Sequence, residues 1–80
     1  MTTVHLQYYA QLREQAGASI ERFSTQATTL RGLYDELRTR HGFSLPVEAL
    51  KVAVNAQFSD WDRTLADGDI IVFIPPVAGG

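Results

Sequence analysis

The chain has 80 residues, with seven Lys and Arg against nine Asp and Glu and a formal net charge of −2. This length allows one domain with a small core, and the absence of cysteine excludes disulfides, a thiolate nucleophile and a cysteine-ligated zinc site. The mild acidity, the lack of an apolar run of about 18 residues and a start unlike a signal peptide predict a cytoplasmic protein that binds neither nucleic acid nor membranes.

The first predicted element is a strand over residues 4–10. Val4, Leu6 and Tyr8 alternate with more polar residues, and this period of two is typical of a strand with one buried face. Residues 10–16 are rich in helix formers and stop at Gly17, which predicts one or two helical turns directly after the strand.

A second strand is predicted over residues 19–24. Ile20 and Phe23 are three positions apart, and this spacing breaks the strict alternation of a regular strand. We therefore expect a β-bulge in this segment.

The clearest element is a helix that begins after Thr29, a good N-cap residue, and ends at Gly42, a good C′ residue. Gly32 inside it costs about 1 kcal/mol relative to alanine, so close packing of the helix on a sheet is expected there. The apolar residues recur at i, i+3, i+4 and i+7, as Leu30, Leu33, Tyr34 and Leu37.

The second half of the chain predicts more strands. Residues 50–55 and 70–74 are apolar strands, residues 58–65 are irregular with a short edge strand, and residues 67–69 form a turn. The order β-β-α-β-β predicts an α+β fold in which a mixed sheet packs on one main helix.

The last strand is apolar on both faces. Ile71 and Phe73 point to one face, and the residues between and beside them point to the other. One helix can cover only one face of so small a sheet, so we expect another protein to cover the second face; a long loop over the strand is the alternative. Aromatic residues are favoured interface anchors and could enlarge this patch, namely Tyr9 and Phe58.

The chain then closes with Pro75-Pro76-Val77-Ala78-Gly79-Gly80. Two prolines stop the strand and hold the following residues extended, and six extended residues reach about 20 Å. The side chains shrink toward the end, so this tail is shaped to enter a narrow tunnel and present its terminal carboxylate to another protein's active site. A frayed terminus is the alternative.

Four segments together resemble the small subunit of molybdopterin synthase, a ubiquitin-like β-grasp sulfur carrier. They are residues 8–14 (YYAQLRE), Val54-Asn55, residues 65–69 (LADGD) and, as the most specific, residues 73–80 (FIPPVAGG). The resemblance covers the whole chain. It implies a β-grasp domain over residues 1–74 and an extended tail over residues 75–80.

The resemblance also implies a function. The Gly80 carboxylate, preceded by Gly79, would be adenylated by an E1-like activating enzyme that consumes ATP, and then converted to a thiocarboxylate. Inside the large subunit the tail would donate sulfur to a cyclic pyranopterin precursor, with catalytic residues on the large subunit and no cofactor bound to this chain. The family suggests two small subunits on a central large-subunit dimer. The expected interface residues are Tyr9, Arg13, Phe58, Val72, Ile74, Pro75, Pro76, Val77 and Ala78.

Other readings remain open at this point. The chain could carry sulfur for thiamine or cysteine synthesis, although thiamine-type carriers are usually shorter and lack residues 10–14, or it could be a ubiquitin-like module that only binds or is ligated to lysines. Arg13 could equally be an ordinary surface charge. His5 and His41 are expected to have surface or capping roles, and Asp67-Gly68-Asp69 is expected to be a turn without a metal.

Overall fold

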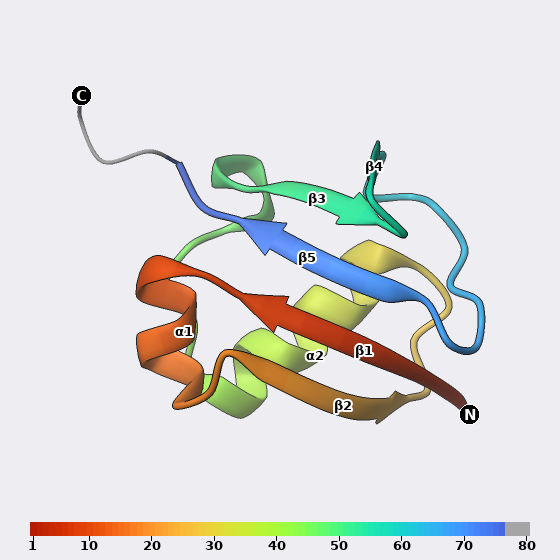
Figure 1. Cartoon of the computed structure of the whole chain (residues 1–80), viewed down its shortest axis with the longest axis horizontal. Helices are drawn as coiled ribbons and strands as arrows, with labels where there is room; N and C mark the ends of the chain where they lie inside the picture. Colours follow the sequence, from red (N-terminus) through yellow and green to blue (C-terminus); the bar gives the residue numbers. More distant parts are fainter. Residues whose placement is uncertain (77–80) are drawn as a thin grey trace.

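A mixed sheet with a long helix packed across one of its faces forms the described part of the chain (Figure 1). The computed structural model describes residues 1–76. Its elements are β1 (Thr2–Tyr8), α1 (Ala10–Ala16), β2 (Ile20–Thr25), α2 (Leu30–His41), a 3₁₀ turn (Val47–Ala49), β3 (Lys51–Val54), β4 (Gln57–Ser59) and β5 (Ile70–Ile74). The strand order is β2-β1-β5-β3-β4, with β1 and β5 parallel and the other pairs antiparallel. This is the ubiquitin-like β-grasp arrangement, so the expected fold class is confirmed.

β1 begins two residues earlier than predicted and ends at Tyr8. Val4, Leu6 and Tyr8 are buried, as their alternation indicated. Tyr9 leaves the strand as the N-cap residue of α1, and α1 ends at Gly17, whose φ of 78° is the left-handed conformation that glycine adopts without strain. The predicted short helix after the first strand is confirmed.

The expected bulge in β2 is wrong. β2 pairs with β1 in one continuous register, from Gln7 opposite Ile20 to Thr2 opposite Thr25. The spacing of three has a simpler cause, because Ile20 and Phe23 lie on opposite faces of a regular strand. Ile20 is 69% exposed, whereas Phe23 packs against the core.

α2 has the boundaries that its sequence predicts. The Thr29 hydroxyl accepts a hydrogen bond from the Gly32 amide at 3.2 Å, and the Gly42 amide donates to the Arg38 carbonyl at 2.8 Å. The expectation that Gly32 packs closely on the sheet is wrong. A Cβ there would lie 3.3 Å from the Ala27 Cβ, which belongs to the loop before the helix. The loop therefore folds back tightly over the first turn of α2.

The C-terminal strands also follow the sequence, with β4 as the short edge strand. The turn over residues 67–69 is confirmed, and Gly68 adopts a φ of 86°. Its two carboxylates are structural: Asp67 Oδ1 accepts from the Thr3 amide at 2.7 Å, and buried Asp69 accepts from Asn55 Nδ2 at 3.0 Å. These contacts tie the turn to β1 and to the end of β3.

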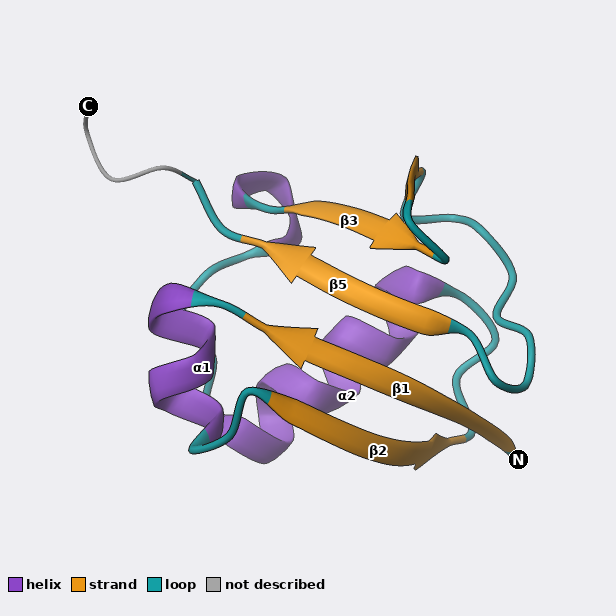
Figure 2. Ribbon diagram, viewed as in Figure 1, coloured by secondary structure: helices purple, strands orange, loops and turns teal. Residues whose placement is uncertain are grey.

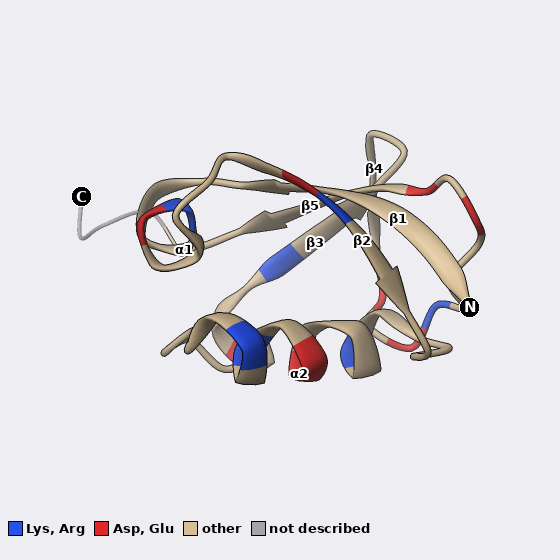
Figure 3. Ribbon diagram, turned by 90° about the horizontal axis from the view of Figure 1, so that it is seen from below, with Lys and Arg blue, Asp and Glu red and all other residues tan. Residues whose placement is uncertain are grey.

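α2 crosses one face of the sheet (Figure 2), and side chains from both of them meet in the core. Seen from the side, α2 runs beneath the sheet, and no helix of residues 1–76 covers the opposite face (Figure 3). We call this second side of the sheet the outer face. The core residues are Val4, Leu6, Tyr8, Leu12, Leu30, Leu33, Tyr34, Leu37, Phe43, Leu50, Val52, Val54, Leu65, Ile71 and Phe73.

Candidate functional site: the outer face and the root of the tail

β5 divides its apolar side chains between the two faces of the sheet. Ile71 and Phe73 are fully buried beneath the sheet, while Ile70 is 46% exposed and Val72 and Ile74 are half-buried on the outer face. The predicted two-sided strand is confirmed. Within residues 1–76 no long loop covers its outer side, so the alternative of a loop over the strand does not hold for this part of the chain.

One row of side chains crosses the outer face from edge to edge. Residues directly opposite one another on neighbouring strands project to the same side of a sheet. The register places these five in line, in the order Ile20, Gln7, Val72, Ala53 and Phe58. We call this set the outer-face row; four of its five members are apolar, and Ile20 and Phe58 at its ends are 69% and 74% exposed.

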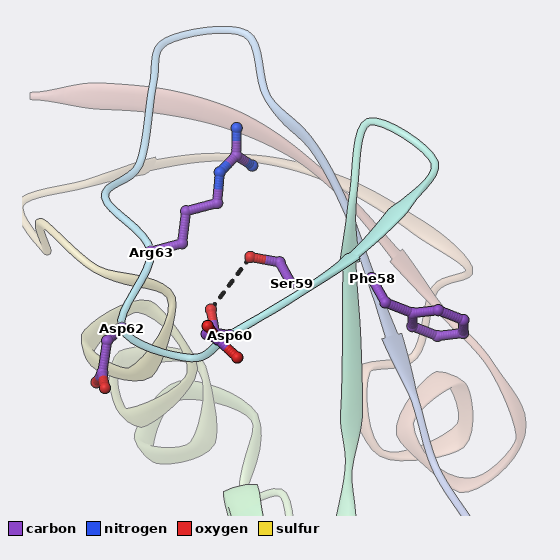
Figure 4. A pocket seen from close by; sticks show the side chains of 5 residues that line it. All are labelled: Phe58, Ser59, Asp60, Asp62 and Arg63. Carbon is purple, nitrogen blue, oxygen red and sulfur yellow. Dashed lines mark hydrogen bonds between the residues drawn. The ribbon is translucent and has the colours of Figure 1, made fainter.

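Phe58 stands at the β4 end of the outer-face row. Phe58 lines a hollow together with Ser59, Asp60, Asp62 and Arg63, and its ring points away from these polar side chains (Figure 4). Its place opposite Ala53 and its 74% exposure present the aromatic ring on the outer face. An aromatic side chain exposed in this way is suited to insert into a partner surface.

Ile74 places the root of the tail at the same face. It lies opposite Lys51 on β3, and the chain continues into half-buried Pro75 and exposed Pro76. A groove surrounds this exit, lined by Glu48, Ala49, Leu50, Lys51, Ile74, Pro75 and Pro76. A partner that covers the outer-face row would thus also meet the first residues of the tail.

Tyr9 and Arg13 lie at the end of β1, where α1 begins. The Tyr9 hydroxyl donates to Gln7 Oε1 at 3.4 Å, and Arg13 lines one hollow together with Gln7, Tyr9 and Ile20. Both residues therefore border the outer-face row. The structure brings together all the expected interface residues within 1–76, whereas Val77, Ala78, Gly79 and Gly80 lie outside the described residues.

Sequence reasoning missed Ile20 and Gln7 as members of this surface. The bulge expected from the spacing of Ile20 and Phe23 does not predict that Ile20 points outward. Gln7 was visible as an outward residue of β1, but its place between Ile20 and Val72 depends on strand order and register. Strict alternation through β2 would have identified Ile20.

His41 also differs from its expected surface or capping role. It is largely buried, and its Nε2 lies 2.8 Å from Glu21 Oε1, which also accepts a hydrogen bond from the Tyr8 hydroxyl at 2.7 Å. Burial alone would raise the pKa of Glu21, but the hydrogen bonds from Tyr8 and His41 and the charges of His41 and Arg40 outweigh it and lower that pKa. Burial, followed by the bond to Glu21, raises the pKa of Tyr8. This cluster faces the core side and is structural.

Among residues 1–76 there is no group of three or more His, Asp or Glu side chains that could hold a metal ion. In the same range, no helix is long and apolar enough to span a membrane. The geometry is that of an open, largely apolar sheet face, and the chain leaves its edge through Pro75 and Pro76.

The chain is a ubiquitin-like β-grasp protein, and the known proteins that it resembles include small carrier proteins. The chain is 32% identical to the molybdopterin synthase sulfur carrier subunit of Escherichia coli K12 over 76 residues, covering 91% of this chain and 94% of that protein. The sequence model of the ThiS family matches residues 6–80. The chain therefore belongs to the ThiS family, the small sulfur carriers of the ThiS and MoaD type.

Solved structures show the same fold. A putative molybdopterin converting factor subunit 1 from Pyrococcus furiosus superposes with a TM-score of 0.79 at 28% identity, covering 96% of this chain and 100% of that one. Subunit 1 of the Helicobacter pylori molybdopterin-converting factor, solved in complex with subunit 2, gives 0.69 at 24% identity over 99% and 100%. The small archaeal modifier protein 1 of H. volcanii gives 0.82 at 22% identity over 96% and 100%, a likeness of fold alone.

Proposed function

We propose that this chain is the sulfur carrier subunit of a molybdopterin synthase. Its E. coli relative, at 32% identity over 91% of the chain, is a subunit of that enzyme. The large subunit is the proposed partner, because a homologous subunit 1 is found in complex with subunit 2 of a molybdopterin-converting factor. Catalytic acids and bases would belong to the large subunit and the activating enzyme.

The chemistry centres on the Gly80 carboxylate. A carboxylate is a poor electrophile, so an E1-like enzyme would join it to AMP with release of pyrophosphate from ATP. A sulfur donor then displaces AMP and leaves a thiocarboxylate, a charged sulfur nucleophile that needs no cysteine. The sulfur would form a C–S bond to a carbon of cyclic pyranopterin monophosphate as a C–O bond of that carbon breaks and the oxygen leaves. Water would then cleave the acyl–sulfur bond, which restores the Gly80 carboxylate and leaves the sulfur on the pterin. Two such transfers build the dithiolene of molybdopterin.

The observation that carries the proposal is the continuity between the outer-face row and the tail. Val72 belongs to the row, and Ile74, two residues further along the same face of β5, lies where the tail begins. A partner that buries the row would hold the tail at a fixed point of entry. Docking and delivery would then be parts of one binding event.

Carriage of sulfur for thiamine or cysteine synthesis is the alternative of related chemistry. The family model bears the ThiS name, but α1 spans a full seven residues here, and thiamine-type carriers usually lack this segment. A module that is ligated to protein lysines is the alternative of a different class. The likeness to an archaeal modifier protein supports only the shared fold.

Intact-mass spectrometry after co-expression with an activating enzyme and a sulfur source tests the carrier chemistry. We expect one oxygen of Gly80 to be replaced by sulfur, in an ATP-dependent reaction. The matched control is the chain without Gly79 and Gly80, which should gain no sulfur. Recovery of lysine conjugates, or an unchanged mass for the full chain, would overturn the proposal.

A further inference from the structure

The charges on the outer face are unevenly distributed. β1 and β5 carry no Lys, Arg, Asp or Glu, and none of the outward positions on the five described strands is a carboxylate. The cations beside the β2 end of the outer-face row and the root of the tail are Arg13, Arg22 and Lys51, whereas Asp60, Asp62 and Arg63 share a hollow with Phe58 at the other end. The outward strand positions carry Arg22 and Lys51 and no carboxylate, so they are cationic although the whole chain has a formal charge of −2.

Each of these cations has a defined place beside the row. Arg22 is exposed on β2, opposite His5 of β1 and one outward position along from Ile20. Lys51, the single lysine of the chain, is exposed on β3 opposite Ile74. Arg13 shares a hollow with Ile20 at the end of α1. The three charges therefore flank the row at its β2 end and at the root of the tail.

Every ion pair formed within residues 1–76 involves a residue of α2, although Arg38 of that helix takes part in none. The ion pairs formed within residues 1–76 involve Arg31 with Asp62 at 3.5 Å, and Arg40 and His41 with Glu21. In that same part of the chain, none involves Arg13, Arg22 or Lys51, although Glu48 lines the groove beside Lys51. Figure 3 shows both signs of charge along α2.

We propose that the outer face is built for a partner surface with an apolar centre bordered by carboxylates. The inference rests on the proposed function, and the partner is the large subunit of the synthase. An exposed ion pair contributes little by itself, but charges of opposite sign around an apolar contact accelerate association and fix the register of two surfaces. Three unpaired cations around an apolar row supply that arrangement.

A second copy of this chain is a poorer occupant of the same face. In a symmetric pair the two outer faces would meet, so each copy would place Arg13, Arg22 and Lys51 against a face that carries the same three cations. Like charges brought together at an interface are unfavourable, because no carboxylate at the outward strand positions offsets them. The face therefore favours a partner of opposite charge over self-association.

Association kinetics with the large subunit test this inference. Arg22→Glu and Lys51→Glu should each slow association and weaken affinity about three- to tenfold at about 0.05 M salt. The loss should shrink at about 0.5 M salt, where screening shortens the range of these charges. The matched control is Arg31→Glu on α2, which changes the net charge equally but lies on the helix side, and it should alter affinity less than twofold.

The outcomes separate the inference from the proposed function. If the large subunit binds and sulfur is transferred, but Arg22→Glu and Lys51→Glu bind no worse than Arg31→Glu, the charge inference fails and the function stands. If the wild-type chain does not bind the large subunit at all, both fail. Sedimentation that shows a dimer of this chain weakened by Phe58→Ala would assign the face to a second copy and also overturn the inference.

Discussion

The carboxylate of Glu21 lies 2.8 Å from His41 Nε2 and thereby joins β2 to the last turn of α2. The same carboxylate accepts a hydrogen bond from the Tyr8 hydroxyl at 2.7 Å, and Arg40 lies 3.6 Å from its second oxygen. Groups from two strands and one helix thus meet at one largely buried acid. This cluster joins the start of β2 to α2, and the Thr25–Glu36 hydrogen bond joins the other end of β2 to the same helix.

Acidification should weaken the fold through Glu21. Its pKa in the folded protein is lower than its ordinary value of 4.5, so the unfolded chain takes up a proton first. The contribution of Glu21 to stability is complete above about pH 4.5 and is lost as the pH falls through the lowered pKa. Glu21→Gln should cost about 1–2 kcal/mol at neutral pH and flatten the acid limb of a pH–stability curve measured by urea denaturation. An unchanged acid limb would show that Glu21 is not the titrating group.

Tyr8 and Tyr9 provide a matched pair for the hydrogen bond in this cluster. Tyr8→Phe removes a buried donor to Glu21 and should destabilise the protein by about 1 kcal/mol. Tyr9→Phe removes a hydroxyl from a residue that is 52% exposed, and it should leave the free energy of unfolding nearly unchanged. Equal losses in thermal denaturation would contradict the role assigned to the Tyr8 hydroxyl.

A substitution at Phe58 should weaken binding to the large subunit without destabilising the fold. Because its side chain is 74% exposed, Phe58→Ala should scarcely change the melting temperature. If Phe58 anchors the outer-face row in the large subunit, the same substitution should cost about 2 kcal/mol of binding free energy by calorimetry. Ile74→Asp should weaken binding to a similar extent, because it places a charge at the root of the tail. Binding unaffected by both changes would move the interface to another surface.

Removal of Gly79 and Gly80 should abolish sulfur transfer while leaving the fold intact. The sheet, α1 and α2, with their packing and hydrogen bonds, are complete within residues 1–76. The truncated chain should therefore melt at the same temperature as the full chain in differential scanning calorimetry. A lower melting temperature would give the tail a structural role that the proposed function does not include.

The sequence predicted the elements whose periodicity is strong. Leu30, Leu33, Tyr34 and Leu37 define α2 without ambiguity, and the two-sided apolar pattern of β5 correctly indicated an outer face. The order of strands could not be read in the same way, because it depends on long-range pairing. That pairing sets Ile20 and Phe58 at opposite ends of one row, although 38 positions separate them along the chain.

The contact between His41 and Glu21 also could not be predicted from the residues around His41 in the sequence. Its position in the last turn of α2 is favourable to the helix dipole, and nothing nearby in the sequence points to Glu21, twenty positions away. Only the packing of α2 on β2 brings the two side chains together. The expected site at Gly80 rests on the tail motif and the family, and it remains a prediction because residues 77–80 lie outside the described structure.

The most direct test of the central claim is consumption of the thiocarboxylate. The sulfur-loaded chain is mixed with the large subunit and cyclic pyranopterin monophosphate, and its intact mass is followed together with the pterin product. We predict that sulfur leaves Gly80, the carboxylate returns and molybdopterin appears, with no reaction when the large subunit is omitted. A loaded chain that keeps its sulfur with these reactants, yet delivers it to a thiamine or cysteine precursor, would contradict the account.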